Sequence, residues 1–122
     1  MVFENDKIFV EIEPFEIPWL KIFAKQPCKE WSECDEDTRV QILRAIDIIE
    51  RAMLRFYNPD KINIASFGNM LPQVHWHVQA RFASDSYFPD PVWGKKRREA
   101  QLDLPDMEEF IERVRKDLEE GL

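Results

Sequence analysis

The two histidines of this 122-residue chain lie two positions apart, as His75 and His77. They occur in the segment Gln73-Val-His-Trp-His-Val-Gln79, in which polar and apolar residues alternate. Such alternation is typical of a β-strand, whose successive side chains point to opposite faces of a sheet. His75 and His77 are therefore expected on one face with Gln73 and Gln79, and the apolar residues between them on the other, buried face.

Two imidazoles on one strand face are compatible with three interpretations. The first is a solvated strand face that happens to carry two histidines. The second is a metal site, because neutral imidazole is a common ligand; His75 and His77 would then need a third ligand from a carboxylate or a cysteine. The third is nucleophilic catalysis, in which one imidazole attacks phosphorus and its other nitrogen is held by an acceptor such as a nearby backbone carbonyl.

The elements that position this strand follow from hydrophobic periodicity. Alternating or short apolar runs predict four strands, and apolar residues at three- and four-residue steps predict two helices. The strands are expected at residues 7–13, 19–25, 61–67 and 73–82, and the helices at residues 36–57 and from about residue 105. The order β-β-α-β-β-α predicts an α+β domain with a mainly antiparallel sheet, and we allow for one further short strand.

Length and composition limit the class of protein. A chain of 122 residues supports one domain, residues 1–122, and 44% hydrophobic residues suffice for its core. The net charge of −7 argues against a protein that coats a nucleic-acid polymer, because neutralising phosphates takes a surplus of Lys and Arg. Three glycines cannot build a glycine-rich phosphate loop. No apolar run is long enough to span a bilayer and the first residues are unlike a signal peptide, so we expect a cytoplasmic protein without membrane contact.

The two cysteines, Cys28 and Cys34, are separated by five residues. This spacing is not the Cys-x-x-Cys of a zinc or redox motif. A disulfide between them is possible in principle, but because no export signal precedes them and the cytoplasm is reducing, we expect both to be free thiols.

The stretch from Lys61 to Gly94 resembles the histidine-triad (HIT) superfamily and looks most like its bacterial diadenosine-polyphosphate hydrolase branch. The resemblance rests on the histidine segment, on Gly68-Asn69 before it, and on Phe-Pro-Asp-Pro-Val-Trp-Gly at residues 88–94. Before residue 61 it rests on the order of elements, with Pro-Trp-Leu at residues 18–20 ahead of the second strand. It implies a five-stranded antiparallel sheet, a homodimer, and a nucleotidyl hydrolase or transferase whose middle histidine attacks the α-phosphate.

One histidine of the family pattern His-φ-His-φ-His-φ-φ, where φ is apolar, is replaced in this chain. In one register the three histidine positions of the pattern are filled by Gln73, His75 and His77. In the other they are filled by His75, His77 and Gln79, which is similar to the galactose-1-phosphate uridylyltransferase branch. The offsets of the residues after the strand favour the first register. It makes His75 the nucleophile and His77 a phosphate contact and proton donor, whereas Gln73 can hydrogen-bond but cannot act as an acid.

Further substrate-binding candidates come from the same resemblance. Asn69 is expected to contact the phosphate or the nucleophile, with an ordinary turn residue as the alternative. Asn63 lies within a predicted strand, and Trp93 could close the pocket, contact a second copy or pack in the core. The basic run at residues 95–98 either attracts a polyphosphate or forms a solvated surface.

Two classes of function follow from these expectations. The first is an enzyme that cleaves dinucleoside polyphosphates or nucleoside phosphoramidates through a nucleotidyl-histidine intermediate; it requires no metal cofactor, although Mg²⁺ can accompany the substrate. The second is a nucleotide-binding or signalling module with little turnover. In both, the partner is a small-molecule nucleotide. The wide apolar stripe of the helix at residues 36–57 supports the homodimer that the resemblance implies.

Overall fold

The computed structural model describes all 122 residues and contains a five-stranded sheet with two α-helices. Its elements are β1 (Phe3–Glu4), β2 (Ile8–Ile12), β3 (Trp19–Ala24), the 3₁₀ turn η1 (Trp31–Glu33), α1 (Glu36–Tyr57), β4 (Lys61–Ala65), β5 (His75–Arg81) and α2 (Met107–Gly121). The predicted α+β class and antiparallel sheet are confirmed, and β1 is the further short strand. Neither helix has the length and apolar character needed to cross a membrane.

The sheet places the histidine strand in an interior position. Its order is β1-β2-β3-β5-β4, and all neighbouring strands are antiparallel. His75 lies opposite Phe23 of β3, and His77 lies between Lys21 of β3 and Ala65 of β4. Because β5 is hydrogen-bonded on both sides, the backbone that carries the two imidazoles is held rigidly.

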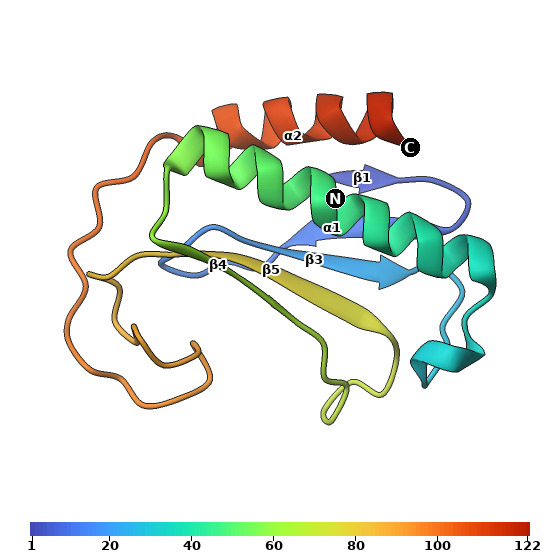
Figure 1. The fold of residues 1–122 in the computed structure, drawn as a ribbon, viewed down its shortest axis with the longest axis horizontal. Helices are drawn as coiled ribbons and strands as arrows, with labels where there is room; N and C mark the ends of the chain where they lie inside the picture. Colours follow the sequence, from blue (N-terminus) through green and yellow to red (C-terminus); the bar gives the residue numbers. More distant parts are fainter.

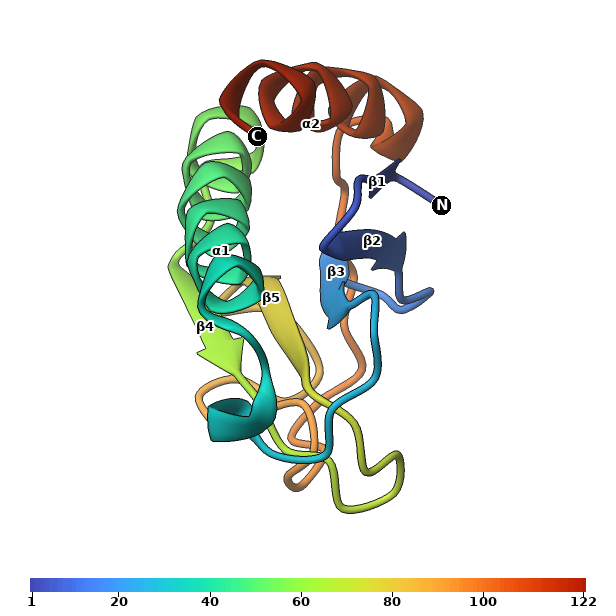
Figure 2. The same cartoon turned by 90° about the vertical axis from the view of Figure 1, so that its right-hand side faces the viewer.

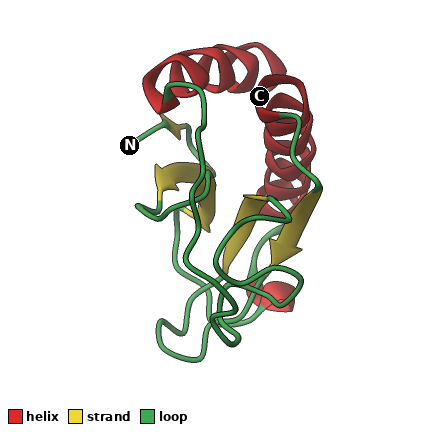
Figure 3. Cartoon of the chain, turned by 90° about the vertical axis from the view of Figure 1, so that its left-hand side faces the viewer, coloured by secondary structure: helices red, strands yellow, loops and turns green.

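Both helices lie on the same side of the sheet (Figure 1). Helix α1 packs over β3, β4 and β5, and α2 packs against α1 and reaches β1 (Figure 2). The apolar side chains on one face of the sheet point toward α1 and form the core with it; they include Leu20, Ile22, Val78 and Ala80, which pack with Ile42 and Ile49 of α1. The connecting segments gather at the end of the molecule away from α2 (Figure 3), so loops rather than helices border the histidine face.

Helix α1 has the bounds that the sequence predicts, residues 36–57. Asp35 caps its start, because its side chain accepts a hydrogen bond from the Thr38 backbone N–H at 2.7 Å. Asn58 ends the helix with a left-handed backbone conformation, φ 47°. The polar residues that flank the apolar repeat therefore fix where the helix begins and ends.

A buried ion pair fixes the chain where it leaves β5. Arg81 donates from Nε and Nη2 to the two carboxylate oxygens of Asp85 at 2.8 and 3.0 Å, and both side chains are 1% exposed. The backbone N–H groups of Phe82, Tyr87 and Phe88 donate to the same carboxylate. Burial alone would raise the pKa of Asp85, but these hydrogen bonds outweigh it and hold the pKa at about 2.

We expect Asp85→Asn to lower the free energy of unfolding by about 3–5 kcal/mol, because it leaves the Arg81 guanidinium buried without a counter-charge. Asp90→Asn is the matched control, since the Asp90 carboxylate pairs with Arg97 at the protein surface. Its expected loss is below about 1 kcal/mol. Urea denaturation of both variants at pH 7 measures the difference, and equal losses would contradict this assignment.

Candidate active site

His75 and His77 border a pocket of about 410 Å³ on the face of the sheet away from α1. The pocket is lined by Phe67, Gly68, Asn69, Met70, Leu71, His75, His77 and Trp93. No Lys, Arg, Asp or Glu lies among these residues. Both imidazoles lie on one face of β5, as the periodicity of the sequence predicts, and the structure adds that this face borders an apolar concavity.

The peptide before β5 fixes the tautomer of His75. The Nδ1 atom of His75 lies 2.8 Å from the backbone carbonyl oxygen of Gln73. Because a carbonyl oxygen only accepts hydrogen bonds, Nδ1 carries the proton. In the neutral ring, Nε2 is then the nitrogen with a free lone pair and can act as a nucleophile.

His77 has the opposite tautomer. The indole N–H of Trp19, which can only donate, donates to His77 Nδ1 at 3.0 Å, so a neutral His77 carries its proton on Nε2. Burial lowers the pKa of His77 to about 4, and electrostatic interactions with the neighbouring His75 and Lys21 act in the same direction. The free protein at neutral pH therefore presents the Nε2–H of His77 as a hydrogen-bond donor without a charge.

Aromatic rings form much of the wall around the imidazoles. The Trp93 ring centroid lies 4.9 Å from that of His77 and 4.8 Å from that of Phe67. On the other side, the ring of Phe23 stacks on His75 at 5.3 Å. Trp93, a predicted site residue, thus lies at the pocket. Phe67 was not predicted as a site residue; the sequence analysis made it the last residue of the strand expected at residues 61–67, whereas β4 ends at Ala65.

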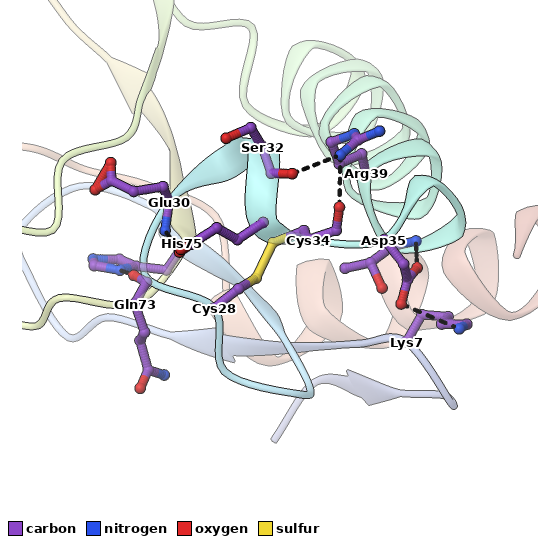
Figure 4. Close-up of a disulfide and its surroundings, with 11 residues drawn as sticks. Lys7, Cys28, Glu30, Ser32, Cys34, Asp35, Arg39, Gln73 and His75 are labelled. Carbon is purple, nitrogen blue, oxygen red and sulfur yellow. Dashed lines mark hydrogen bonds and ion pairs between the residues drawn. A yellow bond between two sulfur atoms is a disulfide. The ribbon is translucent and has the colours of Figure 1, made fainter.

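The structure brings Asn69 to the pocket but not the side chains of Gln73 and Asn63. Gln73 precedes β5, so the predicted strand of residues 73–82 begins two residues too early, and its side chain points away from the His75 ring (Figure 4). Asn63 Oδ1 accepts a hydrogen bond from Arg81 at 2.8 Å. Substrate binding by these two side chains stays a prediction without a pocket contact to support it.

The basic run at residues 95–98 is largely occupied by contacts within the chain. Lys96 pairs with Glu99, Arg97 pairs with the carboxylate of Asp90, and Arg98 donates to two backbone carbonyls of the preceding loop. These contacts lie within the loop that carries Trp93 and stabilise its conformation. They offer no support for the run as a site that attracts polyphosphate.

Cys28 and Cys34 form a disulfide, so the prediction of two free thiols is wrong. That prediction was based on the expected cellular compartment, whereas the fold places the two Cα atoms 5.7 Å apart, within the range that a disulfide spans. Neither cysteine is then available as a metal ligand. No group of three or more His, Cys, Asp or Glu side chains is arranged to hold a metal ion, so the two-histidine metal site lacks a third ligand.

Comparisons with known proteins agree on one family. The sequence pattern of the HIT domain matches residues 1–84. A histidine triad protein from Bradyrhizobium japonicum is 29% identical, with a TM-score of 0.74 over 98% of this chain and 87% of that one. A histidine triad protein from Marinobacter aquaeolei is 27% identical, with a TM-score of 0.74 over 99% and 89%. A search of curated proteins found no match.

We expect His77 to titrate near pH 4 and to make folding less favourable in acid. Its pKa is lowered from about 6.5, so between these values the unfolded chain binds a proton that the folded chain does not. The stability contribution is complete above pH 6.5 and is lost as the pH falls toward 4. From pH 7 to pH 5 the wild type should lose about 2 kcal/mol more than His77→Asn, whose Oδ1 can still accept from Trp19.

Urea denaturation at the two pH values, with NMR titration of the imidazole, measures this effect. A titration midpoint near 6.5 would contradict the burial of the His77 ring.

Proposed function

The chain belongs to the HIT domain family, and on that premise we propose that it is a nucleotide hydrolase or nucleotidyltransferase that forms a covalent nucleotidyl-His75 intermediate. Its substrates are dinucleoside polyphosphates or nucleoside phosphoramidates. The observation that carries the proposal is the hydrogen bond from His75 Nδ1 to the Gln73 carbonyl. It leaves Nε2 as the nucleophile without a dedicated base, beside a second imidazole that can contact phosphate oxygens.

The first chemical step transfers the nucleotidyl group to His75. The Nε2 lone pair attacks the α-phosphorus, a nitrogen–phosphorus bond forms, and the leaving group departs with the electrons of its bond to phosphorus. The positive charge on the ring is shared through Nδ1–H with the Gln73 carbonyl. Water then attacks phosphorus and the nitrogen–phosphorus bond breaks. A nucleoside monophosphate and a proton are released, and the neutral His75 ring is regenerated.

His77 assists at the phosphoryl oxygens. Its Nε2–H can donate to a non-bridging oxygen, where negative charge develops in the transition state. With a pKa of about 4 it holds almost no proton to give at neutral pH in the free protein. An anionic phosphate nearby favours the charged imidazole, so binding of substrate raises the pKa of His77 toward the range of a useful general acid.

The lining of the pocket suits a nucleotide whose scissile phosphate carries little excess charge. Trp93 and Phe67 offer aromatic surfaces for stacking, and the Asn69 side chain is an amide within reach of the pocket. The two imidazoles have no third side chain placed to complete a metal site, and attack by histidine requires no metal, although Mg²⁺ can accompany a polyphosphate substrate.

The assignment of His75, rather than His77, as the nucleophile is supported by the position of Gln79. The alternative register requires Gln79 to contact phosphate. Its side chain is fully buried outside the pocket, and neither polar atom of its amide has a hydrogen-bond partner. His77 is also the less nucleophilic ring at Nε2, because that nitrogen carries the proton.

We expect His75→Ala to abolish the covalent adduct and to lower single-turnover release of nucleotide at least about 10³-fold. His77→Asn should slow adduct formation about 10²-fold yet leave it detectable, because the nucleophile remains. Labelled diadenosine polyphosphate and an adenosine phosphoramidate serve as substrates. Mass spectrometry after an alkaline quench detects the adduct, since a phosphorus–nitrogen bond to histidine is labile in acid.

Calorimetric binding of adenosine monophosphate and the melting temperature of each variant are the controls. Normal turnover by His75→Ala would assign the nucleophile to the other ring. Tight binding by the wild type with neither adduct nor product would instead favour the nucleotide-binding or signalling module, in which replacement of one family histidine has removed turnover.

A homodimer is the second part of the proposal. Strand β4 is an edge of the sheet, and its Ile64 is exposed together with Leu43 and Leu54 of α1, the helix that packs over it. A second copy of the chain would bury these apolar side chains and pair with the free edge of β4.

We expect sedimentation velocity to give twice the chain mass of 14.6 kDa, and Leu43→Glu with Leu54→Glu to shift the protein to the monomer. Ile12→Glu, which changes an exposed apolar residue of β2 away from the β4 edge, tests whether added charge alone causes dissociation. The dimer would be contradicted if the wild type sediments as a monomer both at high concentration and after 100-fold dilution.

A further inference from the structure

The disulfide closes a short loop against the strand that carries the histidines. Between Cys28 and Cys34 only Trp31 is even partly buried, and its ring meets that of Trp76 edge-on at 5.6 Å between centroids. Cys34 is buried and is followed directly by Asp35, the residue that caps α1. The disulfide therefore anchors Cys28 to the start of the longest helix (Figure 4).

The loop and His75 contact the two ends of the same peptide group. The backbone N–H of Val74 donates to the Cys28 carbonyl oxygen at 2.8 Å. The carbonyl of that same peptide, belonging to Gln73, accepts from His75 Nδ1 at 2.8 Å. Because a peptide group is planar, fixing its N–H also fixes the direction of its carbonyl. The orientation of the His75 ring is thus linked to Cys28 through one peptide plane.

From this chain of contacts we propose that Cys28 and Cys34 are positioning residues for His75, and that reduction of their disulfide by a dithiol slows nucleotidyl transfer. The proposal rests on the proposed function for its kinetic part. In the oxidised protein α1, Cys34, Cys28 and the Gln73–Val74 peptide form one continuous support for the nucleophile. After reduction, Cys28 keeps its contacts with the core and with Val74 but is no longer tied through Cys34 to the start of α1.

A small dithiol can reach the bond. A surface pocket of about 250 Å³ is lined by both cysteines, and Cys28 is the more exposed of the two. A thiolate of the reductant attacks one sulfur and forms a mixed disulfide, which its second thiol resolves. Two electrons and two protons pass to the protein, leaving two cysteine thiols, and the reductant becomes a cyclic or linked disulfide.

The effect should appear in kcat more than in KM. The pocket over the disulfide and the pocket at the histidines share no residue. Substrate therefore keeps its binding surface, while the ring that attacks phosphorus loses its fixed tautomer and direction. The carbonyl of Val74 still accepts from the backbone N–H of Ala24 at 3.3 Å, which limits the movement. We expect a fall in kcat of about fivefold to tenfold, the worth of one ordinary hydrogen bond.

The test compares oxidised protein, protein reduced with dithiothreitol, and the Cys28→Ser/Cys34→Ser variant. NMR measures hydrogen exchange of the Val74 amide and the Nδ1–H signal of His75, neither of which requires catalysis. Reduction should speed Val74 exchange about tenfold and weaken the Nδ1–H signal, and the double variant should match the reduced protein. His77, held by Trp19 rather than by the loop, is the internal control and should keep its titration curve.

Dithiothreitol should leave the double variant unchanged, and reoxidation of the wild type should restore kcat, which separates this effect from damage to the fold. Equal Val74 exchange and equal His75 signals in all three proteins would overturn the proposal. So would an equal kcat in oxidised and reduced enzyme. A third outcome is that reduction changes Val74 exchange and the His75 signal although the protein never releases nucleotide. That result would support the link between the disulfide and His75 and refute only the proposed activity.

Discussion

The alternation of side chains along β5 places Val78 and Ala80 in the core beneath α1, and places His77 and Gln79 on the opposite face. One strand therefore serves both the packing of the domain and the pocket. A shift of register by one residue would bury the imidazoles under the helix and expose the core residues. Pairing with β3 on one side and β4 on the other makes such a shift costly, so the two imidazoles are held on the pocket face.

The two imidazoles are close enough to influence each other's charge. Their ring centroids lie 5.0 Å apart, and His77 is the ring for which burial makes the charged form unfavourable. A pocket without Lys, Arg, Asp or Glu does nothing to reverse this effect. His77 is thus an uncharged hydrogen-bond donor in the free protein, and the negative charge of a bound phosphate would favour its charged form.

Periodicity predicted the strand faces, the bounds of α1 and the grouping of His75 with His77, because these depend on contacts close in sequence. It could not predict the indole of Trp19 on His77, which joins residues 58 positions apart. The disulfide was missed for a different reason: free thiols were expected from the cellular compartment alone, and a separation of six residues says little about whether two side chains meet. The basic run was ambiguous until Asp90 and Glu99 were placed beside Arg97 and Lys96.

The groups that orient the two imidazoles are a peptide carbonyl and an indole N–H, not side-chain carboxylates. Both groups are uncharged, so each orients its imidazole through a directional hydrogen bond. Each can do so only if the backbone or side chain that carries it stays in place. For the carbonyl, this requirement is met at the start of β5, where the Val74 N–H is held by the Cys28 carbonyl. For the indole, it is met by β3, which carries Trp19 and is paired with β2 and β5. The orientation of His75, the proposed nucleophile, therefore depends on a contact just before β5, made by Cys28, a residue that does not line the histidine pocket.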